Sequence, residues 1–290
     1  MMTERVLIPR LAILGVGLIG GSLALALKQA GAVGEVIGCG RGKPNLEKAV
    51  ELGVIDSYSR DPLEAVNGAD VVFLATPVKT LGPVTQSCLP GLKSGAIITD
   101  AGSVKGEVVR AIEPLLPEDI HFVPGHPIAG TEKSGAEAAF STLYQGKRCI
   151  LTPTENTNSG ALELIRQMWT EAGSNVVQMS LEKHDKILAA ISHLPHMVAY
   201  SLVNAVGSYD HYEENILEYS AGGFRDFTRI ASSDPTMWRD IAETNRDALL
   251  EMMEQFEVFF AELKTEVMAG SSDKLFDFFQ RSKQLRDAIL

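Results

Sequence analysis

Cysteine and positive charge are both scarce in this chain. Only three cysteines occur in 290 residues, Cys39, Cys88 and Cys149, far apart and without a CxxC pair. This spacing excludes a disulfide framework and favours a reducing compartment, so a cytoplasmic protein is expected. Lysine and arginine total 26 against 37 aspartates and glutamates, which gives a formal net charge of -11. Such an acidic chain repels phosphate backbones, so the composition disfavours nucleic-acid partners.

Residues 11–27 carry no charged side chain. That run is shorter than a membrane span and is interrupted by four glycines, at positions 15, 17, 20 and 21. We interpret it as a strand, a tight turn and a helix, and we expect no membrane partner. Pro9 and Arg10 interrupt the apolar N-terminal residues, so no signal peptide is predicted.

Short apolar strands alternate with helices over the first part of the chain. Strands are predicted at residues 10–15, 35–39, 69–75, 96–100, 121–124 and 148–152, and helices at 22–30 and 45–52. This alternation indicates parallel βαβ units with helices on both faces of a sheet. The prediction is an α/β Rossmann dinucleotide-binding domain over residues 1–179.

From residue 181 onward the sequence predicts helices only, at 182–206, 235–263 and 272–288. Asp234 as the N-cap and Pro235 at the first helical position mark the start of the second of these. The prediction is an all-α C-terminal domain over residues 180–290, with the active site in the cleft between the two domains. A length of 290 residues suits two domains.

Residues 15–20, GVGLIG, match the dinucleotide-binding pattern GxGxxG. Gly15 would make the tight turn, Gly17 would let the backbone approach a pyrophosphate, and Gly20 would let the helix pack on the strand. The helix N-terminus at Leu18 and Ile19 would face the phosphates. Because the motif follows a strand and opens a helix, it predicts a cofactor site; the alternative is a glycine-rich turn without a ligand.

The second predicted strand does not end on a carboxylate that would accept a hydrogen bond from the ribose of NAD. Residues 39–43, CGRGK, stand there instead. An arginine suits a 2′-phosphate, so Arg41 favours NADP over NAD; alternatively, Arg41 stacks on adenine or faces solvent. Thr76 and Pro77 end the third strand at the carboxyl edge of the sheet, where ligands bind, and Thr76 is a candidate contact for the nicotinamide ribose.

A histidine follows the fifth predicted strand directly, on a loop expected at residues 125–130, GHPIAG. Oxidation of an alcohol needs a base for the hydroxyl proton, and histidine suits that role near neutral pH, so His126 is the candidate base. The alternative is a loop histidine that satisfies backbone groups. Ser103 could orient the nicotinamide or the substrate, or Asp100 and Ser103 could be caps of the following helix.

Two further histidines, His193 and His196, lie three residues apart on the first long helix of the second domain, which puts them on nearly the same face. One of the two could instead be a core or capping residue. No recognised ligand spacing accompanies them, and hydride transfer needs no metal, so no metal site is predicted.

Residues 221–230, AGGFRDFTRI, contain two arginines four residues apart. Arg225 and Arg229 could grip a carboxylate in bidentate geometry, and we expect one to be structural and the other to face the ligand. The structural partners would be Asp226, Asp234 or Asp240. An anionic small molecule is therefore the expected substrate.

Together these segments resemble the prephenate/arogenate (cyclohexadienyl) dehydrogenases of tyrosine biosynthesis. The resemblance runs from residue 11 to about residue 246. It rests on residues 15–22, 100–106, 126–132, 192–196 and 222–231, followed by Trp238. The first of these segments is generic to dehydrogenases, whereas the combination of the others is specific.

The resemblance implies oxidative decarboxylation of a cyclohexadiene, with hydride passing to NAD or NADP. It also implies a homodimer formed through the helical domains. By the same likeness, His126 would take the proton of the ring hydroxyl and Ser103 would support His126 and the nicotinamide. Substrate contacts would involve Arg229, His196, His193, Gly222 and Glu132, with Glu132 and Asp185 in a surrounding polar network.

Two other functions are compatible with a Rossmann domain joined to a helical domain. A β-hydroxyacid dehydrogenase generally uses a lysine of the second domain as its acid and base, for which Lys183 and Lys186 are available, but this would leave the His126 and Arg229 segments unexplained. A non-catalytic NADP(H)-sensing protein would bind dinucleotide without turnover.

Overall fold

The N-terminal half is built on a parallel sheet of six strands. The computed structural model describes residues 6–131, 133–209 and 216–289. The strand order is β3-β2-β1-β4-β5-β6, and every pair is parallel. The strands are β1 (Ile8–Leu14), β2 (Val33–Cys39), β3 (Ser57–Ser59), β4 (Val71–Leu74), β5 (Ile97–Asp100) and β6 (His121–Val123). The order reverses between β1 and β4, which is the point where ligands bind in sheets of this kind.

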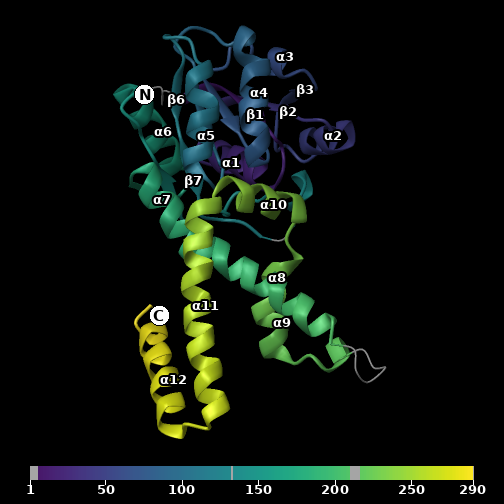
Figure 1. The fold of residues 1–290 in the computed structure, drawn as a ribbon. Helices are drawn as coiled ribbons and strands as arrows, with labels where there is room; N and C mark the ends of the chain where they lie inside the picture. The colour runs from purple at the N-terminus through teal and green to yellow at the C-terminus, as the bar shows by residue number, and fades with distance from the viewer. Residues whose placement is uncertain (1–5, 132, 210–215, 290) are drawn as a thin grey trace.

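Alternate residues of the central strands supply two separate cores. In β1, Leu11 and Ile13 face one side of the sheet, and Ala12 and Leu14 face the other. Both faces are covered by helices, which explains why the strands are nearly continuous apolar runs. The first core is covered by α1 (Leu18–Gln29) and α6 (Ser159–Glu171), and the second by α3 (Pro62–Val66), α4 (Leu81–Cys88) and α5 (Lys105–Ile112). Helix α2 (Lys43–Glu51) lies at the β2 and β3 edge (Figure 1).

A second, three-stranded sheet follows the first. Its order is β7-β8-β9, from β7 (Gly125–Pro127), β8 (Arg148–Leu151) and β9 (Asn175–Gln178), and β7 pairs antiparallel with β8. The expectation of a loop at residues 125–130 was therefore wrong for its first three residues. Pro127 is compatible with a strand here because β7 is an edge strand, where a missing backbone N–H is tolerated.

The Rossmann-type α/β fold predicted from the sequence is confirmed, with corrections at individual strands. The short strands β3 and β9 were not predicted, and the strand predicted at 148–152 belongs to the second sheet. Residues 11–27 form β1, the turn and α1, as expected from their glycines.

The all-helical C-terminal half is also confirmed within the described residues, but two of its predicted helices are interrupted. Residues 182–206 form α7 (Leu181–Leu188), a π-helical turn (Ala189–His193) and α8 (Leu194–Gly207). The ring of Pro195 clashes with a carbonyl one turn earlier and lacks an N–H, which accounts for the irregular turn before it. By length and composition, the stretch Leu181–Gly207 would suffice to cross a membrane, with a mean hydropathy of 1.2.

The second interruption is at Asn245. The predicted helix at 235–263 consists of α10 (Pro235–Thr244) and the longer α11 (Arg246–Ala269), because Asn245 leaves helical geometry at φ -109° and ψ 32°. Gly270 ends α11 in the left-handed region, at φ 61°. The remaining helices are α9 (Gly222–Thr228) and α12 (Ser272–Asp287).

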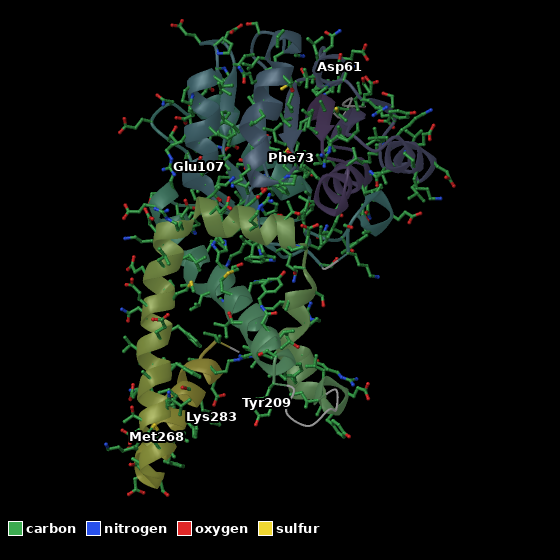
Figure 2. The ribbon with its side chains drawn as sticks, turned by 45° about the vertical axis from the view of Figure 1, so that its right-hand side comes forward. Asp61, Phe73, Glu107, Tyr209, Met268 and Lys283 are labelled. Carbon is green, nitrogen blue, oxygen red and sulfur yellow. The ribbon has the colours of Figure 1, made fainter. Side chains whose placement is uncertain are left out.

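The helical half both covers the sheet domain and extends away from it. Helix α10 lies across one end of the sheet domain (Figure 1). Its residues Trp238 and Ile241 belong to the second core of that domain. An ion pair between Lys79 and Glu243 adds to this contact. Helices α11 and α12 run side by side away from the sheet, as the labels at Met268 and Lys283 show in Figure 2. Their exposed apolar side chains include Val258, Phe259, Phe260, Met268, Phe276 and Phe279.

Replacement of Phe73 by alanine should strongly destabilise the sheet domain. Phe73 is fully buried in β4 and packs edge-on against Trp169 of α6, with ring centroids 5.7 Å apart. Removal of a buried phenylalanine ring lowers the free energy of unfolding by about 3–5 kcal/mol. Chemical denaturation measures this loss. Phe140→Ala is the matched control, because Phe140 is 41% exposed; an equal loss in both variants would contradict the assignment of Phe73 to the core.

Candidate active site

The glycines of residues 15–20 meet three different constraints. Gly15 has φ +108°, and a Cβ atom there would lie 2.4 Å from the carbonyl oxygen of Ala75. A Cβ on Gly20 would lie 2.3 Å from the carbonyl oxygen of Gly15, so the helix can pack this closely only with glycine. A Cβ on Gly17 would meet nothing within 4 Å. The backbone at Gly17 therefore faces open space, which fits the close approach of a pyrophosphate.

Helix α1 begins without a side chain that satisfies its first amides. Its N-cap is Gly17, no side chain caps it, and no acidic residue lies in its first turn. The N-terminal amides around Leu18 and Ile19 and the positive end of the helix dipole are thus available to an anion. These features fit the phosphates of a dinucleotide.

Two residues that the sequence did not single out hold this turn in place. Asn45 Nδ2 donates to the carbonyl oxygen of Val16 at 2.7 Å, and Tyr144 Oη donates to that of Ile19 at 2.6 Å. Asn45 also accepts from the amide of Ala136 at 2.9 Å. No motif marks either residue, because both act through contacts between distant parts of the chain.

The adenosine side of the predicted cofactor site lies at the end of β2. Arg41 is exposed two residues beyond the buried Cys39. Burial and then the charge of Asp61 raise the pKa of the Cys39 thiol to about 11, so Asp61 lies close to this strand end. The Asp61 carboxylate accepts from the amide of Leu63 at 3.0 Å and caps α3. Asp61 therefore serves as a helix cap beside this strand end.

Thr76 and Pro77 follow β4 and lie beside the glycine turn. The methyl carbon of Thr76 is 3.1 Å from the Cβ position of Gly15, and the Thr76 hydroxyl accepts from Thr80 Oγ1 at 2.9 Å. Thr76 is half-buried and Pro77 is exposed. The structure thus brings Thr76 to the turn at the carboxyl edge of the sheet, as the sequence predicted.

A buried ion pair fixes the backbone just before His126. The side chains of Lys105 and Asp100 are both fully buried and bond to each other. Lys105 Nζ also donates to the carbonyl oxygen of Gly125 at 2.7 Å, while the Asp100 carboxylate accepts from the amide of Gly125 at 3.1 Å. Burial lowers the pKa of Lys105, and the charge of Asp100 opposes that shift. Both the backbone N–H and the backbone C=O of Gly125 are therefore hydrogen-bonded to this ion pair.

The alternative that Asp100 and Ser103 are caps of helix α5 is excluded. The N-cap position is Val104, which has no side-chain cap bond. The cap comes instead from the helical domain: Asp185 of α7 accepts from the amides of Lys105 and Gly106, each at 2.8 Å. Ser103 is half-buried in the loop between β5 and α5, at the same edge of the sheet as Thr76.

His126 lies in β7 and joins a line of hydrogen bonds that crosses into the helical domain. Its Nδ1 is 2.8 Å from His184 Nε2, and His184 Nδ1 is 2.8 Å from Asp185 Oδ1. The His126 side chain is buried, and burial holds its pKa well below the usual range, with the charges of His184, Lys105 and His193 adding to that shift. His126 is therefore neutral at neutral pH and can accept a proton.

His193 and His196 both contact Trp238, but in different surroundings. The ring of His196 stacks on Trp238 at a centroid distance of 3.7 Å, and the ring of His193 meets it edge-on at 6.0 Å. His193 is 1% exposed and lies 3.1 Å from Asn245 Nδ2, and burial lowers its pKa to about 4. His196 is half-buried, with Nδ1 donating to the carbonyl oxygen of Ser192 at 2.9 Å. Of the two, His196 is the more accessible to a ligand.

The two arginines of residues 221–230 also differ. Arg225 Nε donates to Ser220 Oγ at 3.1 Å. Arg229 is exposed. Burial lowers the pKa of His196, the hydrogen bond to the Ser192 carbonyl opposes that shift, and the charge of Arg229 adds to it, so the guanidinium lies close to a neutral imidazole. Gly222 is exposed at the first position of α9.

Several other predicted residues lie apart from this group or are engaged elsewhere. Two of the expected arginine partners have other roles, since Asp234 caps α10 and Asp240 pairs with Arg239 at 2.6 Å. Lys186 pairs with Glu182 on the exposed face of α7. Glu132 lies outside the described residues. Within the described residues, no group of three or more His, Cys, Asp or Glu side chains could hold a metal ion.

Both halves of the chain match known family models. The model described as "Prephenate dehydrogenase, nucleotide-binding domain" matches residues 23–178. The model described as "Prephenate dehydrogenase, dimerization domain" matches residues 180–281.

Individual relatives cover nearly the whole chain. A cyclohexadienyl dehydrogenase from Zymomonas mobilis is 39% identical over 280 residues, covering 96% of this chain and 95% of the relative. The prephenate dehydrogenase of Aquifex aeolicus, crystallised with hydroxyphenyl propionate and NAD+, has a TM-score of 0.91 and 38% identity, covering 97% and 98% of the two chains. The arogenate dehydrogenase of Synechocystis has a TM-score of 0.78 and 29% identity, covering 97% of this chain and 100% of that one.

The matched segments begin within α1 at Leu23, just after the glycine turn, and include the β7 strand that carries His126 and the helical segments that carry His196 and Arg229. The resemblance noted from the sequence is thus confirmed over both halves. The Rossmann-type fold and the similarity to these dehydrogenases identify the chain as a nicotinamide-dependent oxidoreductase. It belongs to the prephenate dehydrogenase family.

Proposed function

We propose that this protein oxidatively decarboxylates prephenate or arogenate, in tyrosine biosynthesis, with NADP or NAD as the hydride acceptor. The observation that carries the proposal is the position of His126. It is a buried, neutral imidazole at the carboxyl edge of the Rossmann sheet, linked by hydrogen bonds to the helical domain that carries His196 and Arg229. The candidate base on β7 is thus joined directly to the domain that supplies the proposed substrate-binding residues.

The substrate class has a ring carboxylate and a hydroxyl on the opposite ring carbon. His126 accepts the hydroxyl proton as the hydride leaves that carbon. The proton returns to the same oxygen as the bond to the ring carboxylate breaks, since the product is a phenol and carbon dioxide. When bound, the nicotinamide supplies the hydride acceptor. Aromatisation of the ring makes the overall step effectively irreversible.

A substrate carboxylate is proposed to bind at Arg229, with His196, His193 and Gly222 lining the pocket around the substrate. Arginine offers a planar set of donors that matches a carboxylate. His196 Nδ1 donates to the Ser192 carbonyl, so Nε2 of the neutral ring is left as an acceptor. Ser103 is proposed to orient the substrate hydroxyl and the nicotinamide, and Glu132 is proposed to belong to the polar network around them. The Arg229 guanidinium also offsets locally the acidic net charge of the chain, which would otherwise repel this anion.

For the cofactor, NADP is proposed as the preferred form. The glycine turn and the bare N-terminus of α1 would hold its pyrophosphate, and Thr76 with Pro77 would border the nicotinamide ribose. The support for the 2′-phosphate is the exposed Arg41 just beyond the end of β2.

A homodimer in the cytoplasm is proposed, with the domain boundary between residues 179 and 180. The support for the dimer is the description of the matching C-terminal model and the exposed apolar side chains of α11 and α12. The support for a reducing compartment is that all three cysteines are free and buried. The boundary is supported by the end of β9 at Gln178 and the start of α7 at Leu181.

Initial rates of nicotinamide reduction test the function directly, with prephenate and arogenate each paired with NADP and NAD. Turnover is expected with at least one substrate, and faster with NADP. No turnover in any of the four combinations, from folded protein that binds dinucleotide, would support the sensor or β-hydroxyacid alternatives.

Arg41→Ala should raise KM for NADP on the order of tenfold, because one charge-assisted contact is lost, and leave KM for NAD unchanged. An equal effect of Arg41→Ala on both cofactors would contradict the NADP proposal.

His126→Asn should reduce kcat by about 10²–10⁴, the usual contribution of a general base. The dissociation constant for dinucleotide should not change, because the glycine turn is untouched. Steady-state kinetics and dinucleotide titration measure the two quantities on the same preparation. A variant that turns over as fast as the parent would remove His126 from the mechanism.

Arg229→Ala should chiefly raise KM for the substrate, by roughly 10–100-fold, as expected for loss of hydrogen bonds to a charged group. Arg225→Ala is the matched control, because Arg225 bonds to Ser220 and is not assigned to the ligand. Substrate saturation curves for both variants distinguish them. A normal KM in Arg229→Ala, or an equal rise in both, would exclude the assigned role.

A further inference from the structure

The base His126 does not stand alone but is the first member of a line of three side chains. From His126 Nδ1 the line passes to His184 and on to Asp185, with 2.8 Å at each step. Asp185 in turn accepts from the amides of Lys105 and Gly106 at the start of α5. His126 is 8% exposed and His184 is 0% exposed, so water does not compete for these bonds.

The direction of each bond follows from which groups can donate. A carboxylate only accepts, so His184 Nδ1 carries a proton and donates it to Asp185 Oδ1. A neutral imidazole has one donor and one acceptor, so His184 Nε2 is then an acceptor. It follows that His126 Nδ1 donates to His184 Nε2. The other nitrogen of His126, Nε2, is left with a free lone pair.

We infer that His184 and Asp185 are positioning residues that hold His126 in the one tautomer able to accept the substrate proton. This inference rests on the proposed role of His126 as the base. In the opposite tautomer, Nε2 would carry a hydrogen and could not take the hydroxyl proton. A carboxylate that orients a histidine base through its other nitrogen is the arrangement of the serine-protease triad, here extended by a second histidine.

The one competing arrangement requires a charged His184. A doubly protonated His184 would donate from both nitrogens, and His126 would then accept at Nδ1 and carry its hydrogen on Nε2. Burial lowers the pKa of His184, although its bond to Asp185 opposes that shift, so the neutral form is favoured. The competing state, with His184 doubly protonated and the hydrogen of His126 on Nε2, can be distinguished by the protonation of the ring nitrogens.

The charge of Asp185 also matters when His126 becomes an imidazolium. Around His126 lie Lys105 of α5, Asp100 of β5, Cys149 of β8 and His193 of the π-helical turn, besides His184 and Asp185 of α7. Lys105 disfavours the imidazolium, and its charge is balanced by the bonded Asp100. Asp185 is the anion hydrogen-bonded into the line that ends at His126. It therefore stabilises the protonated base during the reaction.

The tautomer can be read directly by NMR of the protein labelled with ¹⁵N-histidine. The chain has six histidines, and the signals of His126 are assigned by their loss in His126→Asn. The expected result is a proton on Nδ1 and none on Nε2, in both His126 and His184. A proton on Nε2 of His126 would overturn the inference. This readout does not need turnover, so it decides the inference even if neither prephenate nor arogenate is a substrate.

Kinetics of two variants test the consequence for the reaction. His184→Phe keeps a ring of similar shape but removes the acceptor for His126, and Asp185→Asn removes the charge. Each should lower kcat on the order of 10²-fold or more, with KM changed less than about threefold, as when a triad carboxylate is replaced. His121→Phe is the control, because His121 lies in β6 outside the line and should leave kcat unchanged.

The pH profile separates positioning from simple destabilisation. Activity is lost as pH falls through the pKa of His126, because only the neutral base works. Removing the anion disfavours the imidazolium, so in Asp185→Asn the acidic limb of kcat/KM should move to lower pH. An unshifted limb together with a parental kcat in both variants would overturn the inference. A fall in kcat with an unshifted limb and unchanged His126 tautomer would assign these residues a structural role only, and would also overturn it.

Discussion

The carboxylate of Asp185 at the N-terminus of α5 is the contact on which the site depends. The first backbone amides of a helix have no partner within the helix. In α5, the amides of Lys105 and Gly106 donate instead to Asp185, which belongs to the other domain and lies 80 positions after Lys105 in the sequence. Burial would raise the pKa of Asp185, but hydrogen bonds from His184, Lys105 and Gly106 outweigh it, and the net pKa is lowered. The carboxylate is therefore charged at neutral pH. Its contribution to the domain contact is present above its unfolded-state pKa and is lost as pH falls through the lowered value.

Lys105 connects this cap to the base by a second route. Its amide donates to Asp185, while its ammonium group bonds to Asp100 and to the carbonyl oxygen of Gly125. A fully buried ion pair is weak evidence for stability, because removing two charges from water offsets much of their attraction. Its evident effect here is geometric. The residue before His126 is held at both its N–H and its C=O, while Asp185 holds the His126 ring through His184.

How much was predictable depends on whether the signal is local. The central strands could be predicted because both faces of the sheet are buried and the strands are apolar throughout, and the glycine turn because each glycine meets a backbone constraint. His126 could be placed at the sheet edge from its position directly after a strand. That it lies in a strand itself was missed, since Gly125 and Pro127 on either side are typical of a loop.

The contacts that complete the site leave no local pattern. Asp185 caps a helix in another domain, and Asn45 and Tyr144 fix the cofactor turn from distant segments. Each acts between a side chain and a backbone group, so no spacing in the sequence marks it. The helix predicted at 182–206 hides a further feature of this kind, because its continuous apolar pattern gives no sign of the π-helical turn within it.

That π-helical turn decides which histidines share a face. At about 100° per residue, a regular helix would separate His184 and His196 by roughly 120° around the axis. A single π-turn accommodates one extra residue, which reduces the separation to about 20°. His184, which orients the base, and His196, which stacks on Trp238, are thereby brought to one side of the same helical rod. Pro195 forces the irregularity, since it cannot continue the helical bonding of the preceding turn. The proline that interrupts the regular helix thus places His184, which bonds to His126, and His196, which stacks on Trp238, on the same side of the helix.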